Sequence, residues 1–146
     1  MNTHEALKAS AREAAAALGL PLAWEGESFV VPAGPYLRGR VEYDGETAAS
    51  CGEQGLTRLD GALVLAAAVM ARAGRDSDPV SGTGDSEAVR LARRVADLYP
   101  RGRGIETDRG ELVFRVPAVD TPRNDGARVS VSARLAFYGI LQREGV

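Results

Sequence analysis

A chain of 146 residues has the usual size of one domain, so the sequence predicts a single domain over residues 1–146 with one hydrophobic core. Its formal charge of −2 argues against a dedicated nucleic-acid-binding protein, because such proteins usually carry a net basic surface. The single cysteine, Cys51, excludes an intramolecular disulfide, and no apolar run approaches the ~20 residues that span a bilayer.

The first predicted element is an amphipathic helix over residues 3–18, with Thr3 as its N-cap. One face of this helix carries Leu7, Ala11, Ala14 and Leu18. Gly19 and Pro21 are typical of a helix end, and the segment after them favours an extended path.

Residues 36–43 alternate between two side-chain faces, which predicts a strand. Asp44 and Gly45 form the strongest short hairpin signal in the chain, so residues 46–51 are expected to return as the next strand. Residues 58–74 give conflicting signals, because their alanines favour a helix while Leu63–Leu65 and Val69 fit a strand buried on both faces.

Residues 75–84 are rich in Asp, Ser, Gly and Pro, which predicts a loop. Asp85 or Ser86 is expected to cap a second helix that ends before Pro100. Its apolar stripe consists of Val89, Ala92, Val95, Ala96 and Tyr99.

The last third of the chain is predicted to be β structure, with strands over 111–119 and 128–141 and a turn over 122–126. In the final strand the face of Val129 to Phe137 is apolar, while the face of Ser130 to Tyr138 is more polar. We therefore expect a sheet that packs on one side and is exposed, or faces a partner, on the other. Two helices with five or six strands indicate an α+β fold built on one mainly antiparallel sheet.

The sequence shows no pattern of a catalytic, cofactor or metal site. His4 and Cys51 lie far apart, which is unlike a metal cluster or a nucleophile and its base. Asp76, Asp78 and Asp85 lack the spacing of a calcium loop. The glycines of residues 81–84 lack the lysine of a phosphate-binding loop.

Several strand residues are candidates for an interface. Arg38, Arg40 and Arg58 could line a subunit interface, contact nucleic acid, or form a solvated strand face with local ion pairs. Arg134 and Tyr138 belong to the polar face of the last strand and are the other two interface candidates.

The segment from residue 24 to residue 61 carries a family pattern. A tryptophan, a phenylalanine and the run Pro35-Tyr36-Leu37-Arg38 are followed by Arg58-Leu59-Asp60-Gly61, which opens an apolar strand. This order resembles the tail terminator family of long-tailed phages, and the resemblance favours a strand over residues 58–74. The structural positions of the pattern are Trp24, Phe29, Pro35, Tyr36, Leu37 and Gly61.

The resemblance implies a virion protein at the junction of tail and head, assembled in the host cytoplasm. Such a protein forms a homo-oligomeric ring, typically a hexamer, that caps the tail tube, ends its polymerisation and binds the head–tail connector protein. It implies no enzymatic activity, no cofactor, no membrane and no specific nucleic-acid binding, although DNA could pass through the ring. Gene transfer agents use similar parts. The alternatives are another head–tail connector (neck) component, or a small ligand-binding or enzymatic domain that uses the aromatic cluster and the 75–84 loop.

Overall fold

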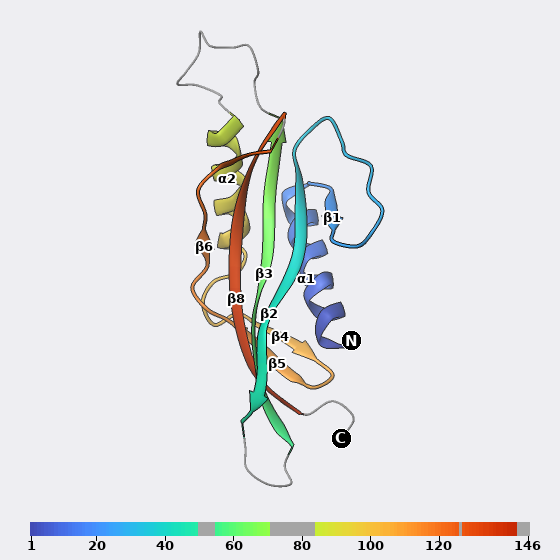
Figure 1. The fold of residues 1–146 in the computed structure, drawn as a ribbon, viewed down its shortest axis with the longest axis vertical. Coiled ribbons are helices and arrows are strands. Elements are labelled where there is room, and N and C mark those ends of the chain that lie inside the picture. Colours follow the sequence, from blue (N-terminus) through green and yellow to red (C-terminus); the bar gives the residue numbers. More distant parts are fainter. Residues whose placement is uncertain (50–54, 71–83, 126, 143–146) are drawn as a thin grey trace.

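The computed structural model describes residues 1–49, 55–70, 84–125 and 127–142. Two helices and one mixed, mostly antiparallel sheet confirm the expected α+β class (Figure 1). The strand order is β1-β2-β3-β8-β5-β4, and two further short strands, β6 and β7, also pair with β8. The continuous path of neighbouring strands across the sheet thus contains six strands. No helix in the described ranges is long and apolar enough to cross a membrane.

Helix α1 spans Thr3–Leu18 and begins with a capping box. The side chain of Asn2 accepts a hydrogen bond from the backbone N–H of Glu5 at 2.8 Å, and the Glu5 carboxylate accepts one from the backbone of Asn2. The N-cap is therefore Asn2, and the prediction of Thr3 was wrong by one position, because Asn2 has the glutamate partner three residues on that completes the box. Gly19 ends the helix in the left-handed conformation, with φ of 68°.

Strand β1 (Leu22–Trp24) pairs in parallel with β2 (Tyr36–Ala48), and β2 pairs antiparallel with β3 (Leu56–Met70). The predicted hairpin turn at Asp44-Gly45 was wrong, because β2 runs straight through these residues. A shift in register between Tyr43 and Gly45 absorbs the irregularity as a bulge, and pairing with β3 then continues. The bulge keeps the ladder intact, which a turn would have ended.

Strand β3 lies between β2 and β8, with both edges hydrogen-bonded, and it confirms the strand predicted from residue 58 as far as Met70. Tertiary pairing here outweighs the helical propensity of the alanines. Residues 71–83, which include most of the predicted 75–84 loop, lie outside the described residues.

Helix α2 spans Gly84–Asp97, so Asp85 and Ser86 lie within its first turn and the prediction that one of them caps the helix was wrong. Its apolar stripe packs on β3 and β8. Four of the five predicted stripe residues are buried and Val89 is half-buried; the buried four are Ala92, Val95, Ala96 and Tyr99.

The edge of β8 (Arg128–Gln142) is shared by three short strands: β5 (Gly110–Phe114), β6 (Ala118–Val119) and β7 (Arg123–Asp125). Strand β4 (Gly104–Thr107) forms a hairpin with β5. The predicted continuous strand over 111–119 is therefore broken, and the predicted turn over 122–126 contains β7. Pro117 and Pro122 have no N–H to donate to a ladder, so they stand between the short strands.

The hydrophobic core lies on the face of the sheet that both helices cover. Strands β3 and β8 pair from Leu56 opposite Gln142 to Met70 opposite Arg128, so their alternate side chains share one face over this whole length. The ring of Phe114 packs edge-on against Tyr99 and Phe137 in this core, at centroid distances of 4.9 and 6.2 Å. We call the opposite face, on which neither α1 nor α2 packs, the open face.

Candidate interface on the open face

The five residues proposed from sequence as an interface share the open face. In register across the sheet, Arg40 of β2 lies opposite Val64 of β3, which lies opposite Arg134 of β8. The other three candidates point to the same face, because each lies an even number of residues from Arg40, Val64 or Arg134 on the same strand, with no bulge of that strand in between. They are Arg38, Arg58 and Tyr138.

One carboxylate on this face lies between two guanidinium groups. Glu42 accepts a hydrogen bond from Arg40 at 2.8 Å and another from Arg134. The bond from Arg134, together with the charges of both arginines, holds the pKa of Glu42 below its usual value. Glu42 therefore stays ionised, and its hydrogen bond from Arg134 links β2 to β8 across the open face of β3.

A second cluster lies farther along the face. Arg58 donates two hydrogen bonds to Asp60, at 2.9 and 3.2 Å, and Arg115 lies 3.7 Å from the same carboxylate. The Arg58 bond lowers the pKa of Asp60. The guanidinium groups of Arg58 and Arg115 also lie over the ring of Tyr138, at 5.2 and 4.7 Å from its centroid, a cation–π arrangement.

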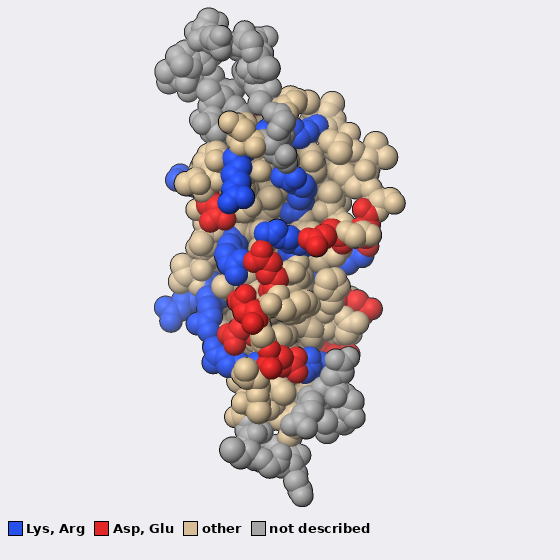
Figure 2. Space-filling view, viewed as in Figure 1, with Lys and Arg blue, Asp and Glu red and all other residues tan. Residues whose placement is uncertain are grey.

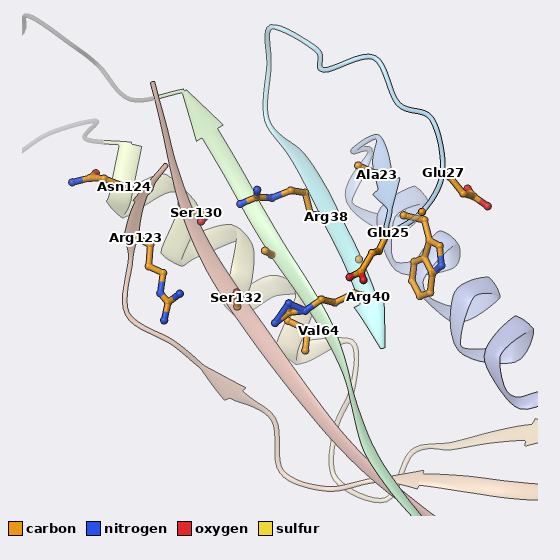
Figure 3. A pocket seen from close by; sticks show the side chains of 14 residues that line it. Ala23, Glu25, Glu27, Arg38, Arg40, Val64, Arg123, Asn124, Ser130 and Ser132 are labelled. Carbon is orange, nitrogen blue, oxygen red and sulfur yellow. The ribbon is translucent and has the colours of Figure 1, made fainter. Parts of the chain in front are cut away.

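A hollow of about 640 Å³ crosses the open face, and we call it the trough (Figure 3). Its floor is made of small side chains of β3 and β8. Arg38 and Arg40 of β2 rise on one side, and Arg123 of β7 rises on the other. The floor consists of Val64, Ala66, Ser130 and Ser132.

Three of the four floor residues are buried although neither α1 nor α2 covers them, and Ser132 is half-buried. Val64 is 4% exposed, Ala66 9% and Ser130 8%. Such small side chains cannot rise above the long arginines beside them, which leaves a depression with apolar and hydroxyl groups at its base and charge along its rims. Figure 2 shows charged side chains of both signs along this face, with basic ones at its upper end and basic and acidic ones side by side below.

The residues of the family pattern divide between the two faces. Trp24 and Leu37 are buried in the core, and Gly61 lies against Phe137 there. Phe29 packs on Tyr36, the first residue of β2, with ring centroids 5.3 Å apart. Pro35 directly precedes this strand.

Tyr36 itself belongs to the open face, and the guanidinium of Arg128 lies over its ring at 5.1 Å from the centroid. Gly39 of β2 lies opposite Leu65 of β3. An added Cβ at Gly39 would lie 2.8 Å from the Trp24 ring, so the glycine makes room for the tryptophan.

Sequence reasoning missed two arginines of the site. Arg123 fell in the predicted turn over 122–126, and Arg115 fell in a predicted continuous strand with no assigned role. Only the pairing of β7 with β8 brings Arg123 to the rim of the trough. The Asp125-Gly126 pair just before β8 is a local hairpin signal that could have indicated this pairing.

The sequence predicts no metal site, and no group of three or more His, Cys, Asp or Glu side chains that could hold a metal ion occurs in the parts of the chain that the structure describes. Cys51, Asp76 and Asp78 lie outside those parts.

Comparison with known proteins adds a likeness of fold. No family model matches the chain, and no curated protein matches it. A solved structure of a protein whose name states no function aligns with 99% of this chain and 100% of its own, with a TM-score of 0.57 and 22% identity. At this identity the likeness bears on the fold alone.

Proposed function

We propose that the protein is a tail terminator of a long-tailed phage or a phage-derived particle such as a gene transfer agent. It is a structural assembly protein without catalytic activity. Copies of the chain form a ring, a hexamer by the family resemblance, at the end of the tail tube. The ring ends polymerisation of the tube protein and binds the head–tail connector protein, so that the protein resides at the junction of tail and head.

The observation that supports this proposal most is the open face. Three strands of 13 to 15 residues present it without a covering layer of helices, and it carries all five interface candidates. Guanidinium groups that stack on a tyrosine and share carboxylates are typical of protein interfaces, where arginine and tyrosine are enriched. A protein that works by assembly needs such a face more than it needs a catalytic cleft.

The fold also suits a rigid building block. Pairing of β3 with β8 over their whole length, with β2 alongside, makes a stiff sheet that holds the open face in one shape. A ring made of such subunits has a defined diameter, because each contact repeats the same angle between neighbours. A fixed diameter is what a cap on a tube of fixed width requires.

The deciding experiment is deletion of the gene in cells that produce the particle, followed by electron microscopy of the tails. We expect tails of uncontrolled length and heads without attached tails, both restored by the wild-type gene. Normal tail lengths in the deletion strain would rule the proposal out. Finding the protein on heads that have no tail would favour the alternative neck component.

The trough favours a second candidate, a small non-catalytic ligand-binding domain. A volume of about 640 Å³ falls within the range of small-molecule sites. This alternative predicts a ligand-dependent rise in melting temperature and a monomer at all concentrations. A ring in the presence of tail tubes would contradict it.

A further inference from the structure

Three arginines and two glutamates line the trough: Arg38, Arg40 and Arg123, with Glu25 and Glu27. Glu27 is paired with Lys8, and the Glu42 carboxylate that bonds Arg40 is shared with Arg134. Lys8 and Arg134 do not line the trough. A protein with a formal charge of −2 thus has more basic than acidic side chains in this trough.

The spacing of the rim arginines matches an extended chain. Arg38 and Arg40 are alternate residues of β2 and point to the same face, so their Cα atoms lie about 6.5–7 Å apart. Carboxylates at alternate positions of an extended peptide repeat at the same distance. Arg123 lies across the floor, where it can meet a carboxylate from the other side.

We propose that the trough binds an extended acidic segment of a partner protein, with carboxylates at alternate positions over the rim arginines and small apolar side chains on the floor. The proposal rests on the proposed function, since the segment would belong to one of the proteins that the ring joins. Arginine suits this role, because its planar guanidinium can hold a carboxylate through two N–H groups while it keeps a second contact. Ser130 and Ser132 offer hydroxyls to the backbone of the segment.

The same features disfavour a nucleic-acid backbone. Duplex DNA carries one negative charge per ~1.7 Å of its axis, which demands a dense and continuous basic track. Here Glu25 lies among the lining residues of the trough, and Asp120 lines the hollow that continues from it beside Arg134. A peptide with a few spaced carboxylates can avoid these acidic groups, whereas a phosphate backbone cannot.

The first test is titration of the full chain with a synthetic eight-residue peptide that has glutamate at alternate positions and alanine or valine between them. Calorimetry gives the affinity, and amide chemical shifts give the location. We expect the largest shift changes at Val64, Ala66, Ser130 and Ser132. A control peptide of the same composition, with its glutamates in one block, should bind at least about fivefold more weakly, because its charges lack the spacing of the arginines.

The second test is a pair of matched charge reversals. Arg40→Glu with Arg123→Glu changes two exposed arginines of the trough, and Arg93→Glu with Arg94→Glu changes two exposed arginines of α2 on the other side of the molecule. Both double variants alter the net charge equally. We expect the trough variant to weaken peptide binding at least about tenfold and the α2 variant to weaken it by less than about threefold.

Circular dichroism establishes that each variant is folded. If the trough reversal unfolds the chain, Arg40→Gln with Arg123→Gln replaces it and should still weaken binding at least about fivefold. Equal losses in the trough and α2 variants, shift changes away from the trough, or preferential binding of a duplex DNA oligonucleotide would each overturn the proposal.

The same measurements separate this proposal from the proposed function. If deletion of the gene changes tail length but the trough binds no acidic peptide, only the trough inference is overturned. If the trough binds the peptide as described but deletion leaves tail length normal, the trough inference stands as a peptide site and the terminator function is overturned.

Discussion

Gly61 of β3 has no room for a larger side chain. A Cβ added at Gly61 would lie 2.5 Å from the carbonyl oxygen of Glu42 and 2.7 Å from the ring of Phe137. The first contact is with backbone, which cannot move without disturbing the pairing of β2. Since overpacking of this kind costs about 1–3 kcal/mol, we expect Gly61→Ala to lower the free energy of unfolding by that amount, measured by urea denaturation.

Gly34 provides the matched control. No heavy atom lies within 4 Å of a Cβ built there, so Gly34→Ala adds the same methyl group to open space. We expect its free energy of unfolding to be unchanged or raised by up to about 1 kcal/mol, since alanine restricts the unfolded chain. A similar loss of stability in both variants would contradict the packing explanation.

Ser10 of α1 and Tyr99, which follows the end of α2, form a buried hydrogen bond with their hydroxyl oxygens 2.7 Å apart. Tyr99→Phe leaves the Ser10 hydroxyl buried without this partner, so we expect a loss of about 1–3 kcal/mol in urea denaturation. Ser10→Ala combined with Tyr99→Phe removes both partners. The double variant should therefore be more stable than the sum of the single losses predicts, and simple additivity would contradict the coupling.

Burial raises the pKa of the Tyr99 hydroxyl above its usual value of 10.0. A group whose pKa is higher in the folded state than in the unfolded state contributes stability that is complete below the unfolded pKa and is lost as pH rises through the folded pKa. We expect the wild-type protein to lose stability above about pH 10. The Tyr99→Phe variant should lose less over the same range, as measured by thermal unfolding at a series of pH values.

At the scale of elements, Arg109 holds one end of the sheet together. It lies in the turn between β4 and β5, and its guanidinium donates to both oxygens of Glu46 on β2, at 3.2 and 2.9 Å. It also donates to the backbone carbonyl of Gln142 at the end of β8, at 2.7 Å. Three segments far apart in the sequence thus meet at one side chain.

We expect Arg109→Ala to lower the free energy of unfolding by only about 1 kcal/mol, because the pair is partly exposed to solvent. The free energy of local opening of the β4–β5 hairpin should fall by more, so amide hydrogen exchange in residues 104–114 should become faster. Arg101→Ala, at an exposed arginine just before this hairpin, is the control and should leave exchange unchanged. Uniform acceleration over all strands in Arg109→Ala would contradict a local role.

The elements that were predicted correctly are those in which the repeat of apolar side chains along the sequence matches the side chains that are buried in the structure. Strand β8 and the stripe of α2 were predicted because alternation and the i, i+3, i+4 pattern each survive over many residues. The Asp44-Gly45 turn failed because a two-residue signal is local, while the register between β2 and β3 is set by pairing over their whole length. The β7 strand was missed for another reason, because its three residues are too few for side-chain alternation to show.

The candidate site was predicted in part. Arg38, Arg40 and Arg134 lie on one face because each strand alternates, which the sequence shows strand by strand. That the three strands are neighbours, and that their small residues form one continuous floor, depends on the strand order β2-β3-β8. Strand order follows from long-range pairing, which no local pattern encodes.

At the scale of the whole molecule, most of the buried hydrophobic side chains of the described residues form one cluster. It takes in both helices and the central strands, with Leu7 from α1, Val95 from α2 and Leu63 from β3 among its members. Neither helix can leave the sheet without exposing part of this shared core to water. A chain of 146 residues with one core is therefore expected to unfold in a single cooperative step.

Two probes test this expectation at different places in the fold. Far-ultraviolet circular dichroism follows both helices, whereas fluorescence follows Trp24, the single tryptophan, which is 6% exposed and packs edge-on against His4 of α1 at 5.7 Å. We expect the same urea midpoint and the same slope from both probes, and Gly61→Ala should move the two midpoints together. Separate midpoints would contradict the single domain predicted over residues 1–146, because the part around Trp24 would then unfold without the rest of the sheet.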